Sequence, residues 1–112
     1  MAFVIHKSVN YRPLCFTAHQ DEVIEVQGIA VRSGDHDIEI INIYIPPVSA
    51  CDSGYIPNVQ HLLEGDFRIV LRDFNAHHSS WYSSLGCDPR GVIISDQIDD
   101  TDFCPINEPF PT

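Results

Sequence analysis

Polar side chains with catalytic potential follow an apolar run in the stretch RIVLRDFNAHHSSW, residues 68–81. Residues two apart share one face of a strand. One face of a strand here would therefore carry three apolar residues and then two polar ones, namely Phe67, Ile69, Leu71, Asp73 and Asn75. This change predicts a strand that runs through the core and leaves it at its C-terminal end, where ligands collect in open α/β sheets.

A second strand shows a similar change, because Asn42 and Tyr44 share a face with Ile38 and Ile40. If the two strands pair, a carboxylate, two carboxamides and a phenol converge. A carboxylate can hold a divalent cation or accept a proton from water, and amide or phenol donors can stabilise developing negative charge. The alternative is a plain turn, since an Asp-x-Asn sequence after a strand often satisfies its own backbone.

The elements that position these residues follow from the hydrophobic pattern and the turn signals. Gly34-Asp35 lies in a hairpin turn over residues 33–37, and Gly28 marks a bulge. Helices end at Gly65 and near Asp100. The predicted strands are 2–7, 22–32, 38–45, 66–75 and 102–107, and the predicted short helices are 58–65 and 90–100. Hairpins mixed with helical crossovers indicate an α/β fold with a mixed sheet.

Composition limits the function classes. The 112 residues are 44% hydrophobic and carry a net charge of −10. Affinity for DNA comes largely from Lys and Arg on phosphates, so the charge disfavours nucleic acid as a partner. No apolar run reaches the length of a membrane span, and the first residues do not form a signal peptide. We therefore expect an intracellular, soluble protein whose four cysteines are mostly buried thiols.

The motifs INIYIPP and DFNAHHSSW together resemble the endonuclease/exonuclease/phosphatase family, and more narrowly the apurinic-type endonuclease domain of non-LTR retrotransposons. The resembling residues extend over nearly the whole chain. They are Tyr44, Pro46, Pro47, Asp73-Phe74-Asn75-Ala76-His77-His78, Trp81, Arg90-Gly91, Asn107 and Pro111-Thr112.

The resemblance implies a four-layer α/β/β/α sandwich with mixed sheets and Mg²⁺-dependent hydrolysis of a DNA phosphodiester, which nicks target DNA for retrotransposition. It implies that Asp73 positions or deprotonates the attacking water and gives the metal an indirect or weak ligand. Asn75 would orient the water, and Tyr44 would hydrogen-bond the phosphate. Asn42, His77 and Thr112 are assigned to substrate binding. A functional parent element would act in the nucleus.

The chain departs from the family pattern in ways that matter for activity. The resemblance places a metal-holding Glu upstream of these residues and a Ser-Asp-His segment downstream of them. It therefore predicts that residues 1–112 are one partial domain lacking its N-terminal and C-terminal portions. Arg72 stands where the family has Gly before Asp-Phe-Asn, and its charge favours ionised Asp73. We expect no measurable nuclease activity from the chain alone.

Two other functions stay open. One is another phosphohydrolase of the same superfamily, acting on small phosphate esters or lipids. The other is a non-catalytic acidic module that presents an interaction surface, which the negative charge favours.

Overall fold

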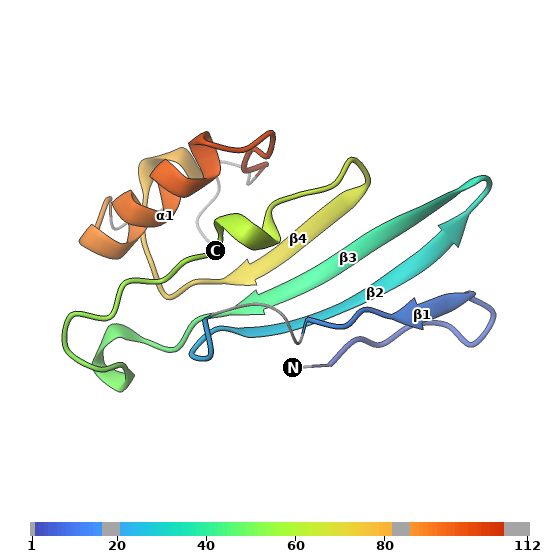
Figure 1. Ribbon diagram of the computed structural model, residues 1–112, viewed down its shortest axis with the longest axis horizontal. Coiled ribbons are helices and arrows are strands. Elements are labelled where there is room, and N and C mark those ends of the chain that lie inside the picture. Colours follow the sequence, from blue (N-terminus) through green and yellow to red (C-terminus); the bar gives the residue numbers. More distant parts are fainter. Residues whose placement is uncertain (1, 17–20, 82–85, 107–112) are drawn as a thin grey trace.

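A computed structural model describes residues 2–16, 21–81 and 86–106. Its four strands form one sheet in the order β1-β2-β3-β4. The strands are β1 (Tyr11–Pro13), β2 (Glu25–Ser33), β3 (His36–Tyr44) and β4 (Arg68–Asp73), and the helix is α1 (Pro89–Asp99). β1, β2 and β3 pair antiparallel, whereas β3 and β4 pair parallel. Figure 1 shows α1 beside β4, with β1 at the opposite edge of the sheet. The predicted α/β class with a mixed sheet is confirmed.

The β2–β3 hairpin is the longest regular part of the sheet. Its turn contains Gly34 at φ 61°, a conformation that glycine adopts readily, so the predicted hairpin is confirmed. The bulge predicted at Gly28 is wrong, because Gly28 pairs with Ile41 in an unbroken register. A Cβ there would lie 2.8 Å from Ile41 Cγ2 and 2.9 Å from Phe16 Cε2. Glycine at this position therefore lets the Phe16 ring pack directly on the strand.

The connection from β3 to β4 is less helical than its sequence suggests. Only a 3₁₀ turn, η2 (Gln60–Leu62), forms within the predicted helix 58–65. The Val59 backbone N–H donates to Gln97 Oε1 at 2.7 Å, so α1 satisfies this backbone group. The prediction that Asn58 caps this helix is wrong, because the N-cap of η2 is Val59 and no side chain caps it. Asn58 Oδ1 accepts from Gln60 N at 3.2 Å, a local turn contact.

Two predicted strands are wrong. Residues 2–7 and 102–106 are irregular, and residue 107 lies outside the described residues. A strand needs a paired neighbour to satisfy its backbone groups, and the place beside β2 is taken by β1. The predicted burial of the thiols is also wrong, because Cys15, Cys87 and Cys104 are exposed.

The core lies between α1 and one face of the sheet. Ile41, Ile43 and Ile45 are fully buried there, together with Leu62, Phe74, Trp81 and Ile94. The opposite face of β4 is open: Phe67, Ile69 and Leu71 are 51%, 51% and 50% exposed. The prediction that this apolar row faces the core is therefore wrong for this chain. The inward row of β4 is Arg68, Val70 and Arg72. The charge of Arg68 is compensated by an ion pair with Glu39 at 3.1 Å.

Candidate active site

Tyr44 and Asp73 are direct neighbours in the sheet. They are register partners on the parallel strands β3 and β4, and both lie at the C-terminal end of their strand. The Ile45 backbone N–H donates to Asp73 O at 2.9 Å, which continues the pairing just past the end of β3. Register partners project from the same face of a sheet, so the phenol and the carboxylate lie on the open face of β3 and β4.

The backbone turns sharply after Asp73. Asp73 Oδ1 accepts from the Asn75 backbone N–H at 3.1 Å, and Asn75 has φ 48°. Asparagine tolerates this left-handed conformation better than most residues. The Asn75 side-chain amide donates to Ile45 O at 2.7 Å. The Asp73 carboxylate therefore fixes the turn that follows its own strand, and the Asn75 amide nitrogen joins that turn to the end of β3.

The remaining predicted site residues are Asn42, His77 and Thr112, and among them Asn42 is placed on the same sheet face as Tyr44 and Asp73. Asn42 lies two residues before Tyr44 on the same face of β3, beside Leu71. His77 is held through its backbone, because its N–H donates to Asp88 Oδ2 at 3.2 Å and its carbonyl accepts from Asp88 N at 2.9 Å. Thr112 lies outside the described residues.

Arg90 connects the INIYIPP and DFNAHH motifs through hydrogen bonds to their backbones. Its residue is 6% exposed, and its Nη1 donates to Pro46 O at 2.6 Å and to Phe74 O at 3.2 Å. One guanidinium therefore satisfies a carbonyl from each motif. In the sequence, Arg90 stands out only as part of the Arg-Gly pair. Its role in the structure follows from its burial, because a buried charge needs polar partners, which here are backbone carbonyls.

The first turn of α1 packs tightly on the backbone of the loop that follows β4. Asp88 caps the helix, with its Oδ1 accepting from Gly91 N at 2.7 Å. A Cβ at Gly91 would overlap the His77 backbone carbonyl. The Arg90-Gly91 pair thus has a structural basis: Arg90 binds the two motif carbonyls, and Gly91 allows the loop to approach the helix.

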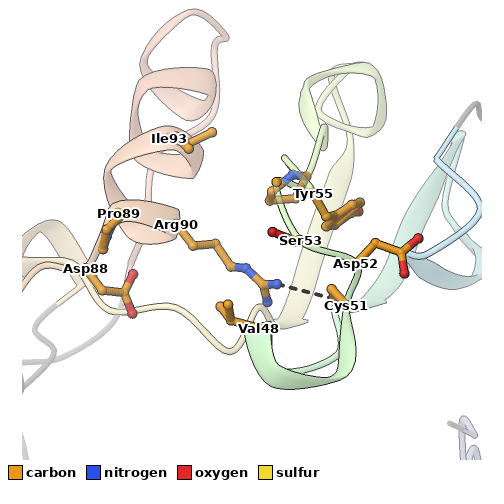
Figure 2. Close-up of a pocket in the computed structure, with 11 residues that line it drawn as sticks. Val48, Cys51, Asp52, Ser53, Tyr55, Asp88, Pro89, Arg90 and Ile93 are labelled. Carbon is orange, nitrogen blue, oxygen red and sulfur yellow. Dashed lines mark hydrogen bonds between the residues drawn. The ribbon is translucent and has the colours of Figure 1, made fainter.

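A hollow of about 380 Å³ lies between the start of α1 and the loop after β3. Figure 2 shows Arg90 reaching across it to Cys51, whose Sγ accepts from Nη2 at 3.5 Å. Tyr55 donates its hydroxyl to Asp21 Oδ2 at 2.6 Å, and burial together with this Asp21 hydrogen bond raises the pKa of Tyr55. Tyr44 and Asp73 do not line this hollow, so the predicted site lies on the open sheet face instead.

The residues around Asp73 do not by themselves fit a metal site. Within residues 2–16, 21–81 and 86–106, no group of three or more His, Cys, Asp or Glu side chains is placed to hold a metal ion. Mg²⁺ usually binds proteins through one or two carboxylates and completes its octahedral shell with water and substrate phosphate. Among the predicted site residues Asp73 supplies the one carboxylate, and its Oδ1 already accepts from the Asn75 N–H.

A comparison with known protein families places most of the chain in one family. The family model described as endonuclease-reverse transcriptase matches residues 38–112. This segment begins within β3 and includes Tyr44, Asp73 and Asn75, and the chain belongs to that family. Neither curated proteins nor solved structures give a significant match. In the part of the chain that the structure describes, no helix is long and apolar enough to cross a membrane.

Proposed function

We propose that the chain carries part of a phosphodiester-cleaving centre of the DNA endonuclease kind, with Tyr44 and Asp73 facing the substrate. The observation that carries this proposal is the pairing of the two residues at the C-terminal ends of adjacent parallel strands. Two polar groups that project from one open sheet edge can contact the same phosphate. The family membership of residues 38–112 supports the same chemistry.

Each residue has a separate role in this proposal. Asp73 orients the attacking water or accepts its proton, because its second carboxylate oxygen stays open to solvent while Oδ1 accepts from Asn75 N. Tyr44 donates its hydroxyl to a phosphate oxygen as negative charge increases. Asn75 acts as a positioning residue, because its amide binds Ile45 O at 2.7 Å.

The fold of the complete centre is a four-layer sandwich in this proposal, and residues 1–112 are one partial domain of it. The open row Phe67, Ile69 and Leu71 supports this arrangement, because apolar rows of this kind on a sheet pack against a second layer. The site would then lie at the edge where the two layers meet.

Phosphate recognition by this edge can be tested with thymidylyl-thymidine, a dinucleotide that carries one phosphodiester. A single phosphate keeps repulsion by the net charge of −10 small. Titration of the isotope-labelled chain should move the amide resonances of Tyr44, Asp73 and Asn75 and saturate in the millimolar range. Shifts confined to α1 or to β1, or no saturable shift, would count against the proposal.

Cleavage of plasmid DNA tests the chemical step. The chain alone should not nick supercoiled plasmid in Mg²⁺ buffer, because catalysis of this kind needs several groups acting together and the negative charge opposes DNA binding. Agarose gels would measure the nicked form. Mg²⁺-dependent nicking by the wild-type chain that disappears in Asp73→Ala would show that the described site is catalytically sufficient.

A second candidate is a non-catalytic acidic interaction module. The net charge of −10 and the half-exposed apolar row on β4 favour it. It predicts no saturable binding of the dinucleotide at Tyr44 and Asp73, so the titration separates it from the first proposal. The other alternative, a phosphohydrolase acting on small phosphate esters or lipids, predicts that a phosphate monoester titrated in the same way binds more tightly than the dinucleotide.

A further inference from the structure

Arg72 lies on the inward face of β4 and is not used by the site described above. Its guanidinium carbon lies 5.4 Å from the centre of the Phe74 ring and 5.0 Å from the Trp81 ring. In residues 2–16, 21–81 and 86–106 the structure gives this guanidinium no hydrogen bond and no ion pair. Burial lowers the pKa of Arg72, and the neighbouring Asp73 charge opposes that effect. The cation is thus poorly solvated and without an anionic partner on its own face.

A hollow of about 110 Å³ lies next to this guanidinium, between β4, the end of α1 and the segment after it. Its described walls include the apolar residues Leu63, Val70, Phe74, Trp81, Ile98 and Phe103, and Arg72 is the single charged residue among them. The hollow is partly open to solvent and is smaller than the closed apolar cavity of about 150 Å³ that binds benzene. It therefore suits an apolar group of about one ring or smaller that keeps contact with solvent.

From this combination we infer a binding site for a small amphipathic anion, in which a carboxylate pairs with Arg72 and an apolar group enters the hollow. A planar guanidinium binds a carboxylate through two parallel hydrogen bonds. The aromatic neighbours hold the guanidinium in place and leave its N–H edge available. The apolar group of the ligand gains free energy by leaving water.

This site is independent of the proposed phosphodiester centre. Adjacent residues of a strand point to opposite faces, so Arg72 points toward the α1 side of the sheet and Asp73 toward the open side. A ligand on Arg72 would leave Tyr44 and Asp73 accessible, and the two proposals can therefore fail separately.

Benzoate and benzamide are matched probes, because they share a ring and differ in charge. Calorimetric titration of the full chain should give a benzoate dissociation constant on the order of millimolar. Benzamide should bind at least about tenfold more weakly, since it cannot form the charge-assisted pair. Inorganic phosphate, which has charge but no apolar group, should not displace benzoate. The fluorescence of Trp81, the one tryptophan in the sequence, should change with the same constant.

Three variants locate the binding. Arg72→Met keeps an apolar stem and should remove the preference for benzoate over benzamide. Arg32→Met removes the same charge from an exposed position, where the Arg32 side chain is 55% exposed, and should leave the preference intact. Ile98→Phe keeps Arg72 and fills the hollow, so it should weaken benzoate binding about tenfold or more. It also serves as the test if Arg72→Met does not fold.

Equal binding of benzoate and benzamide by the wild-type chain would overturn the inference. So would an unchanged preference in folded Arg72→Met, or unchanged benzoate binding in folded Ile98→Phe. Displacement of benzoate by phosphate at equal concentration would show a bare anion site and would also overturn it.

Discussion

At the scale of single residues, the Asp73–Asn75 turn is compatible with both interpretations of its sequence, a plain turn and part of an active site. Asp73 Oδ1 and the Asn75 amide satisfy local backbone groups, which is the behaviour of a plain turn. The same hydrogen bonds fix the exposed Asp73 beside its register partner Tyr44. The structural role of the turn therefore supports the chemical role that we propose for the pair.

Asn75 offers a test of this turn. Asn75→Asp should lower the free energy of unfolding by about 1–3 kcal/mol, because a carboxylate oxygen would face Ile45 O without a proton to donate. Asn75→Gly accepts the positive φ easily and should cost less than Asn75→Asp. Urea denaturation would measure both. Neither variant keeps the amide donor, so a negligible cost in both would show that the 2.7 Å hydrogen bond to Ile45 O contributes little.

At the scale of elements, α1 acts as the support for both motif loops. Its second residue, Arg90, binds Pro46 O and Phe74 O, and its third residue, Gly91, lies against the His77 carbonyl. These contacts join the ends of β3 and β4 from the side opposite the open face. The position of Tyr44 relative to Asp73 thus depends on residues that touch neither of them.

Arg90→Met should destabilise the chain by about 2–4 kcal/mol, because Phe74 O loses its charged donor and Pro46 O keeps only the Cys51 thiol at 3.7 Å. Arg90→Lys keeps a charged donor for the two carbonyls, which are both bound by the single atom Nη1, but it lacks the Nη2 donor to Cys51 Sγ. We therefore expect it to recover only part of this loss, and thermal unfolding would measure the series. Full recovery by Lys would mean that one charged donor at Pro46 O and Phe74 O is enough to stabilise the loops.

Gly91→Ala tests the close approach of α1 and the loop. Alanine normally favours a helix over glycine by about 1 kcal/mol, but here its methyl group would overlap the His77 carbonyl. We expect a net loss of about 3 kcal/mol or more, comparable with overpacking at its severe end. Val92→Ala, on the exposed side of the same helix, should stay within about 0.5 kcal/mol of wild type. A stabilising Gly91→Ala would contradict the described packing.

The sequence predicts local structure well where local chemistry decides it. The Gly34-Asp35 turn, the hairpin strands and the helix predicted over residues 90–100 follow from residue types alone, whereas the Asp88 cap was not predicted. Which face of β4 points inward was not predictable in the same way, because both faces of the strand carry apolar residues. Only the packing of α1 decides that Val70 faces the core and Ile69 faces solvent. Arg90 was missed as a positioning residue because its partners are backbone carbonyls 44 and 16 positions away.

At the scale of the whole molecule, the chain is a sheet covered on one side. Ile41 is fully buried beneath α1, whereas Ile69 on the other face is half exposed. This asymmetry agrees with the proposal that a second layer belongs on the open face. The net charge of −10 opposes self-association of the half-exposed apolar face through repulsion between copies, and it does not favour binding to DNA.

A comparison of two isoleucine variants measures this asymmetry. Ile41→Ala should cost about 2–5 kcal/mol in urea denaturation, as for other buried residues of this size. Ile69→Ala should cost less than about 1 kcal/mol, because its side chain already meets solvent. If Ile69→Ala costs as much as Ile41→Ala, the open face is covered in solution, for example by a second copy of the chain.

The most direct test of the central claim compares Tyr44→Phe with Tyr11→Phe. Each variant removes one hydroxyl group from a strand residue, and Tyr11 lies on β1 at the opposite edge of the sheet. The account predicts that Tyr44→Phe weakens thymidylyl-thymidine binding about tenfold, the usual value of a hydrogen bond to a charged group, while Tyr11→Phe binds like wild type. Equal affinities for both variants and the wild-type chain would contradict a phosphodiester site at Tyr44 and Asp73.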